Sequence, residues 1–141
     1  MNINNDFTKT VDIIHRAMDV SILRRNVIAN NVANAEVPNF KRTQVNFETE
    51  LKKALESERK RPIIEMKQED PRHISNWSVQ DYRNVEPRRV TDFLSQSNNN
   101  GNNVDMEQEL TDSIQNQLMY TLLAQSAAFE FNQVNSALRQ G

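Results

Sequence analysis

The side chains that could do chemistry in this chain are few. Its 141 residues include two histidines and no cysteine, which excludes a thiol nucleophile, a disulfide and a thiolate metal site. His15 and His73 lie on unrelated segments, without the spaced carboxylates that would complete a metal site. The two glycines, at positions 101 and 141, cannot form a glycine-rich phosphate loop. We therefore expect no enzyme, no cofactor and no metal.

Three pairs of basic residues raise the question of nucleic-acid binding: Arg24 with Arg25, Lys60 with Arg61, and Arg88 with Arg89. Each pair has acidic or apolar neighbours, and the net charge of −2 gives no general attraction to polyanions. We interpret the pairs as solvated charge, with a bond across subunits as the alternative for the first pair. No apolar run approaches the roughly 20 residues of a membrane span. The N-terminus lacks the apolar region of a secretory signal peptide.

The elements that could position side chains begin with a long N-terminal helix. Apolar residues recur at spacings of three and four between Phe7 and Val32, which is a helical period. The stripe drifts around the helix, which favours partners on two sides, although an ordinary bundle helix would show the same pattern. Proline disfavours helix at the residue before it, so the helix ends by Val37. Pro38 and Asn39 predict a type II turn with a positive φ at Asn39.

A second long helix is expected from about Asp105 to Arg139. Asp105 is a good N-cap, and Gln108 completes a capping-box pattern. A heptad seam, typical of helices packed side by side, follows. Its members are Tyr120, Ala124, Ala127, Phe131, Val134 and Leu138. A second, offset apolar face consists of Leu110, Ile114, Leu118, Leu122 and Phe129.

The residues between the two helices are expected to form an insertion that is less regular than the helices. Val45 and Phe47 alternate like a short strand, residues 47–60 have a charged helical pattern, and residues 63–66 form a possible strand. The low-complexity stretch 95–103 is expected to be a linker with no reason to fold.

These patterns predict a mainly α fold. The N- and C-terminal helices are expected to pair as an antiparallel, coiled-coil-like hairpin, with an irregular middle insertion of short helix and strand pieces. The predicted boundaries are 1–42 for the N-terminal helix and turn, 43–103 for the insertion and Asn-rich linker, and 104–141 for the C-terminal helix. The two helices together form one domain.

The residues around Pro38 resemble a known family signature. The run Ala29-Asn30-Asn31-Val32-Ala33-Asn34-Ala35-Glu36-Val37-Pro38-Asn39-Phe40-Lys41 is similar to Ala-Asn-Asn-(Leu/Ile/Val)-Ala-Asn-Ala-x-Thr-Pro-Gly-Tyr-Lys of bacterial flagellar rod, hook and hook-associated proteins. Val37 and Asn39 depart from the usual Thr and Gly, but Asn tolerates a positive φ, so the turn should persist. Val104-Asp105-Met106-Glu107-Gln108-Glu109 is similar to the Val-Asp-x-Glu-x-Glu motif of the same axial family.

One internal segment points to a branch of the family. Asp70-Pro71-Arg72-His73-Ile74 is similar to an element of the proximal rod proteins. The Gly-Gly-Pro-Tyr-Arg-Arg insertion of the sister protein FlgC is absent.

The resemblance implies a structural subunit of the flagellar basal-body rod, required for motility. It implies assembly through the terminal helices into the tubular axial structure, which transmits torque and encloses the export channel. The implied partners are further copies, FlgC-, FlgF- and FlgG-like rod proteins, the rod-base protein FliE and the type III export apparatus. The implied location is the basal-body rod, which crosses the periplasm, with export that needs no cleaved signal peptide. A soluble helical-hairpin adaptor and another rod protein such as FlgC are the alternatives.

Subunit contacts are predicted at both ends of the chain. The amides of the N-terminal helix are expected to be exposed and to bond to another chain, while its alanines permit close approach. The predicted contact residues are Leu23, Val27, Asn30, Asn31, Ala33, Asn34, Pro38, Phe40, Tyr120, Ala127, Phe131, Val134 and Leu138.

Overall fold

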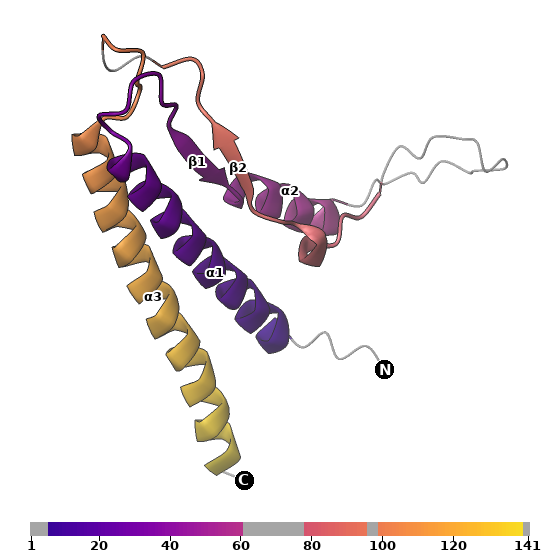
Figure 1. The fold of residues 1–141 in the computed structure, drawn as a ribbon. Coiled ribbons are helices and arrows are strands. Elements are labelled where there is room, and N and C mark those ends of the chain that lie inside the picture. Colours follow the sequence, from indigo (N-terminus) through magenta and orange to yellow (C-terminus); the bar gives the residue numbers. More distant parts are fainter. Residues whose placement is uncertain (1–5, 61–77, 96–98, 140–141) are drawn as a thin grey trace, which may run out of the picture. The chain divides into compact units, whose positions relative to one another are not determined.

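The computed structural model describes residues 6–60, 78–95 and 99–139. In chain order its elements are helix α1 (Asp6–Ala33), strand β1 (Thr43–Asn46), helix α2 (Glu48–Arg59), the 3-10 helix η1 (Tyr82–Asn84), strand β2 (Arg88–Thr91) and helix α3 (Met106–Arg139) (Figure 1). The mainly α prediction is confirmed. The predicted strand at 63–66, the 70–74 element and His73 lie outside the described residues.

The chain divides into two compact units, residues 1–45 with 89–141, and residues 46–88. The first unit contains both terminal helices, and the second contains α2 and η1. The predicted domain boundaries after residues 42 and 103 stay a prediction.

In the first unit α1 and α3 lie side by side and run in opposite directions (Figure 1). The helical period of α1 places Ile14, Val20 and Val27 on its buried side. Where the start of α1 lies beside the C-terminal part of α3, the rings of Phe7 and Phe131 pack edge to face with their centroids 6.0 Å apart. Aromatic quadrupoles favour this arrangement. The predicted antiparallel hairpin of terminal helices is confirmed.

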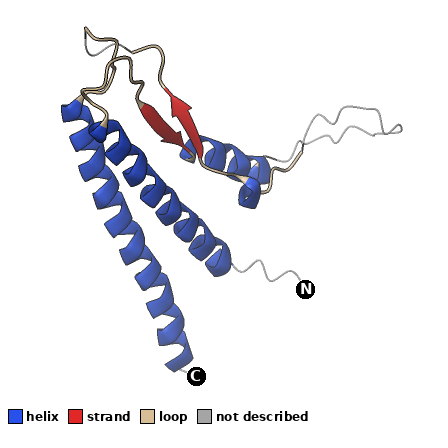
Figure 2. Cartoon of the chain, viewed as in Figure 1, coloured by secondary structure: helices blue, strands red, loops and turns tan. Residues whose placement is uncertain are grey.

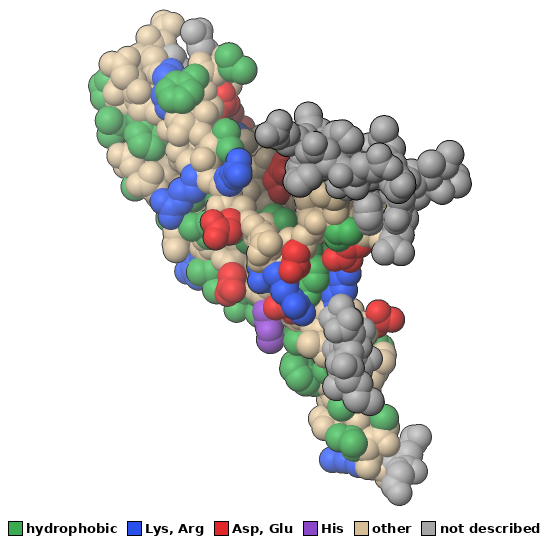
Figure 3. Space-filling view, turned by 90° about the vertical axis from the view of Figure 1, so that its right-hand side faces the viewer, with side chains coloured by type: hydrophobic (Ala, Val, Ile, Leu, Met, Phe, Trp, Pro, Cys, Tyr) green, Lys and Arg blue, Asp and Glu red, His purple; other side chains and the backbone are tan. Residues whose placement is uncertain are grey.

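The heptad seam of α3 is covered over only part of its length. Tyr120 and Ala127 are half-buried. Val134 is 37% exposed and Leu138 is 75% exposed, so the seam is bare at its C-terminal end. Figure 3 shows hydrophobic side chains (green) at the surface near the lower tip of the molecule, the level at which α3 ends in Figure 1.

The chain leaves α1 through the predicted turn. Asn39 has a φ of 60°, and the Phe40 N–H donates to the Val37 carbonyl at 3.3 Å. The positive φ at Asn39 confirms the prediction made from the Pro38–Asn39 pair. Beyond the turn, β1 pairs with β2 in a two-stranded sheet whose strands run in opposite directions (Figure 2).

The second unit has a small apolar interior. Its buried apolar residues are Phe47, Ala54 and Tyr82. The Ser57 hydroxyl accepts a hydrogen bond from the Gln80 N–H at 2.9 Å, which ties α2 to the segment before η1. The helix predicted over residues 47–60 is confirmed as α2.

Candidate functional site

Residues 99–103 fold against the end of α1, so the expectation that this stretch has no reason to fold is wrong for them. The Asn102 side chain is fully buried. Its Nδ2 donates to the carbonyl oxygens of Asn34, Ala35 and Val37 at 2.8–2.9 Å, and its Oδ1 accepts from the Val104 N–H at 2.7 Å. These three carbonyls belong to the turn that follows Ala33. Asn102 therefore holds the turn after α1 from a distant part of the chain.

Asn103 ties the same stretch to the chain on either side of the sheet. Its Oδ1 accepts from the Arg42 N–H at 2.6 Å. Its Nδ2 donates to the Asp92 carbonyl at 2.7 Å and to the Ser95 hydroxyl at 3.1 Å. The side chain is 3% exposed, and its satisfied polar atoms make its burial stable.

Gly101 lets this stretch approach the turn closely. Its φ is 79°, and a Cβ added to it would lie 2.6 Å from Asn39 Oδ1. The Lys41 ammonium donates to the Gly101 carbonyl at 2.7 Å, and the Asn39 N–H donates to the Asn100 carbonyl at 3.1 Å. Only glycine fits this position without strain.

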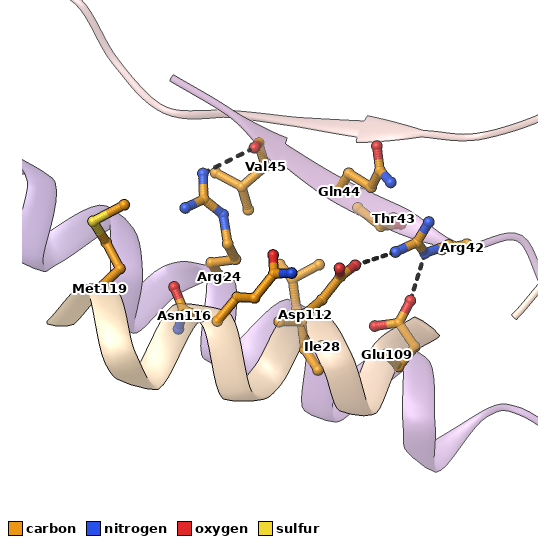
Figure 4. Close-up of a pocket in the computed structure, with 12 residues that line it drawn as sticks. Arg24, Ile28, Arg42, Thr43, Gln44, Val45, Glu109, Asp112, Asn116 and Met119 are labelled. Atoms are coloured by element: carbon orange, nitrogen blue, oxygen red, sulfur yellow. Dashed lines mark hydrogen bonds and ion pairs between the residues drawn. The ribbon is translucent and has the colours of Figure 1, made fainter. Parts of the chain in front are cut away.

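A buried carboxylate lies at the first turn of α3. Glu109 is fully buried, and Arg42 bridges it to Asp112, with 2.5 Å contacts to both carboxylates (Figure 4). Asn31 Nδ2 lies 3.2 Å from both Glu109 oxygens. A buried charge is tolerated when it is paired and hydrogen-bonded in this way.

Asn31 also joins α1 to β1. Its amide donates to the Thr43 carbonyl at 2.8 Å and accepts from the Thr43 N–H at 3.1 Å. It is 1% exposed, so the expectation that this amide is exposed is wrong. The polar residue is buried because backbone groups of β1 and the Glu109 carboxylate satisfy its donors and acceptor.

The start of α3 explains the Val-Asp-x-Glu-x-Glu pattern. Asp105 Oδ1 accepts from the Glu107 and Gln108 N–H groups at 2.9 and 3.3 Å, which confirms the predicted N-cap. The Gln108 side chain instead donates to Asp112 at 2.7 Å, so the reciprocal half of the capping box is wrong. Val104 is 2% exposed. The motif thus combines a core residue, a cap and the buried Glu109.

The residues predicted to contact other subunits differ in their exposure at the surface of the chain. Val27 and Asn31 are buried within the chain; Leu23, Asn34, Phe40, Tyr120 and Ala127 are half-buried; Asn30, Ala33, Pro38, Phe131, Val134 and Leu138 are exposed. The Asn34 amide donates to the Asn30 carbonyl of its own helix at 2.7 Å. Their part in subunit contacts stays a prediction.

The offset apolar face of α3 is bare along the helix. Its five residues, here called the outer stripe, are Leu110 (63% exposed), Ile114 (63%), Leu118 (60%), Leu122 (50%) and Phe129 (61%). Exposed apolar rows of this kind mark interaction sites in soluble proteins. The apolar spacing of the sequence predicts this second face, but the predicted contact residues of α3 lie on the heptad seam instead.

A pocket of about 300 Å³ opens between α1, β1 and α3 (Figure 4). Its apolar lining is Val27, Ile28, Val45 and Met119. Asn116 also lines it, with its Nδ2 donating to the Ser21 carbonyl at 2.8 Å. Its buried Oδ1 has no hydrogen-bond partner, the one such side-chain atom in the described part of the chain.

The remaining candidates for chemistry are ordinary surface features. His15 is exposed, as expected for a surface histidine (Figure 3, purple). Arg24 donates to the Val45 carbonyl of its own chain at 3.4 Å. Within residues 6–60, 78–95 and 99–139, no cluster of three or more His, Asp or Glu side chains could hold a metal ion. None of the described helices is long and apolar enough to span a bilayer.

Comparison with known proteins agrees with this architecture. The family model described as "Flagella basal body rod protein" matches residues 23–41. The flagellar basal body rod protein FlgB of Borreliella burgdorferi is 44% identical over 135 residues, covering 96% of this chain and 99% of the relative. The chain belongs to the FlgB family of flagellar basal body rod proteins. The FlgB proteins of Borrelia hermsii (40% identical) and Bacillus subtilis (30%) match 96% of this chain and 99% and 97% of their own lengths.

Membership of the FlgB family makes the chain a structural component of the flagellar rod, which assembles with other rod components. The resemblance found in the signature turn is confirmed over nearly the whole chain. The family match covers residues 23–41, which include Asn31, the partner of Glu109, and the turn carbonyls that accept from Asn102.

Proposed function

We propose that the chain is a proximal-rod subunit that assembles through its terminal helices, with the outer stripe of α3 as the principal contact surface. The observation that carries the proposal is the exposure of all five outer-stripe side chains, each 50–63% exposed. Burying a fully exposed side chain of this kind is worth about 1.5–3 kcal/mol, so roughly half of that is available at each of these half-exposed positions. A row of five therefore supplies the driving force for packing against helices of neighbouring subunits.

Further predicted contacts lie at the two ends of the hairpin. Phe131, Val134 and Leu138 form a separate exposed surface at the C-terminal end of the heptad seam, while Asn30 and Pro38 are exposed near the signature turn. The buried Val27 and Asn31 act within the chain and hold the hairpin in the shape that assembles. Of the other predicted contact residues, Ala33 adds an exposed position, and Leu23, Asn34, Phe40, Tyr120 and Ala127 add half-buried ones.

In this role the chain forms part of the tubular axial structure that crosses the periplasm, transmits torque and encloses the export channel. Its partners are further copies, FlgC-, FlgF- and FlgG-like rod proteins and the rod-base protein FliE. The type III export apparatus delivers it without a cleaved signal peptide. The role is structural and needs no catalysis, cofactor or metal, and motility depends on it.

Deletion of the gene followed by electron cryotomography of flagellar motors tests the proposal. We expect motors that stop at the membrane ring and lack rod, hook and filament. A complete rod in the deletion strain would overturn the rod function and leave the helical-hairpin adaptor as the better explanation.

Complementation of the same strain tests the contact surface. Leu118→Asp places a charge in the outer stripe, and we expect no rod and no swimming. The matched control is Gln117→Asp, at an exposed polar position one residue away, which should restore both. Because Leu118 is 60% exposed, the variant should keep the helical circular-dichroism spectrum of the wild type. Normal rods with Leu118→Asp would contradict the proposed surface.

A further inference from the structure

The pocket between α1, β1 and α3 is suited to an apolar group that carries a hydrogen-bond donor. Val27, Ile28, Val45 and Met119 give it apolar walls. The buried Asn116 Oδ1 has no donor among the described residues. Buried acceptors are nearly always paired, so the orphaned oxygen indicates where an incoming donor belongs.

Two large apolar side chains project from the turn after β2. Phe93 is 73% exposed and Leu94 is 96% exposed; together they are called the Phe93–Leu94 knob. The Asp92 carboxylate accepts from the N–H groups of Leu94 and Ser95 at 2.9 and 3.1 Å. The Asp92 N–H donates to the Arg42 carbonyl at 2.8 Å. Since these bonds already fix the turn, the knob loses little conformational entropy when it docks.

The geometry points to the Phe93–Leu94 knob of one copy entering the Asn116 pocket of a neighbouring copy in the rod, an inference that rests on the proposed function. A cavity of about 150 Å³ holds a benzene molecule, so the pocket of about 300 Å³ accommodates a phenyl ring and a leucine side chain. The Phe93 N–H has no acceptor within the described part of the chain. It supplies the donor that Asn116 Oδ1 lacks.

A second copy is the occupant because knob and pocket are different surfaces of one chain. Such a contact is heterologous, and heterologous contacts build an open helical array when their rotation does not close into a ring, as a rod requires. Two large side chains bury on the order of 300–400 Å², at most half of the roughly 800 Å² that each partner contributes to a stable interface. The knob contact alone is therefore too small to form a stable dimer, and it acts together with the outer stripe.

Disulfide crosslinking in assembled rods tests the contact, because the chain has no cysteine of its own. Leu94→Cys and Met119→Cys are co-expressed as two single-cysteine chains in the deletion strain, and isolated basal bodies are oxidised. Met119 lines the pocket and is 52% exposed. The control pairs Leu94→Cys with Leu138→Cys, which is 75% exposed and lies outside the pocket.

We expect at least tenfold more disulfide-linked dimer of this chain from the Met119→Cys pair than from the control pair. Equal yields, no dimer, or a crosslink from Met119→Cys to a different rod protein would each overturn the knob contact. If Leu118→Asp still blocks the rod in that case, the proposed function stands. Normal rods with Leu118→Asp would instead count against the proposed function.

A charge in the knob gives a second test that needs no cysteine. Leu94→Asp should abolish swimming with the fold intact, because the side chain is almost fully exposed. Val90→Asp, at a position of β2 that is 51% exposed, should swim normally. Normal rods with Leu94→Asp would overturn the inference, even if the cysteine variants build no rods.

Discussion

Replacing Asn102 with alanine should destabilise the hairpin strongly, although the residue lies in a low-complexity stretch. The substitution removes the two amide hydrogens that serve three carbonyl oxygens and the acceptor for the Val104 N–H. Leaving a buried polar group unsatisfied costs about 1–3 kcal/mol. Residues 34 and 35 are half-buried and Val37 is exposed, so water replaces part of the loss. We expect the free energy of unfolding to fall by about 3 kcal/mol, counting roughly two unsatisfied groups.

Urea unfolding followed by circular dichroism at 222 nm measures this change. With a slope of about 2 kcal/mol per molar urea, the midpoint should fall by roughly 1.5 M. The matched control is Asn99→Ala, an exposed residue of the same stretch, which should change the free energy of unfolding by less than about 0.5 kcal/mol.

Asn102→Asp separates the role of the amide hydrogens from that of side-chain volume. The carboxylate has the size of the amide but no hydrogens, and it would face three carbonyl oxygens. Asn102→Asp should therefore be less stable than Asn102→Ala. A midpoint for Asn102→Ala within about 0.3 M of the wild type, which is under 1 kcal/mol at that slope, would refute the role of Asn102 in holding the turn after α1. The reverse order of the two variants would refute the role of the donors.

Two further predictions concern charged groups. Glu109→Gln should lower the free energy of unfolding by about 2–3 kcal/mol. This is less than the 3–5 kcal/mol expected for a broken buried ion pair, because Asp112 still pairs with Arg42. Urea unfolding measures the change, and in the control variant Glu107→Gln, at an exposed position, the free energy of unfolding should fall by less than about 1 kcal/mol. The Ser95 hydroxyl, the N–H groups of Leu94 and Ser95, and the Arg42 charge lower the pKa of Asp92. The Asp92 carboxylate therefore stabilises the turn fully above about pH 3.9, the usual Asp pKa. This stabilisation is lost as the pH falls through the lower pKa that Asp92 has in the folded state. Amide NMR shifts of Leu94 and Ser95 should change with pH below 4, and Asp92→Asn should abolish that change.

The sequence predicted the elements whose signals are local. Apolar spacing located both long helices, the Pro38–Asn39 pair located a turn with a positive φ, and Asp105 located the start of α3. Each of these signals involves residues within a few positions of one another, where propensity and sterics decide the backbone.

The contacts of the candidate site depend on residues far apart in the chain. Asn102 meets its carbonyl partners 65–68 positions away, and Asn31 meets Glu109 78 positions away. The chain contains nineteen asparagines, and composition alone does not distinguish an amide that holds a distant turn from one in a solvated linker. A glycine between asparagines was the available signal, because Gly101 at positive φ marks a close backbone approach.

The choice between the two apolar faces of α3 shows why the contact surface could not be read from periodicity. The two residues of α3 that are buried are polar, Glu109 and Asn116, while Leu118 on the outer stripe is 60% exposed. A monomeric hairpin stabilised by apolar burial would have the reverse arrangement. Directional polar bonds from Glu109 and Asn116 fix the register of α3 on α1, because a slipped register would leave them unpaired. The apolar side chains are then available for intermolecular packing, which fits a subunit that gains much of its stability in the rod.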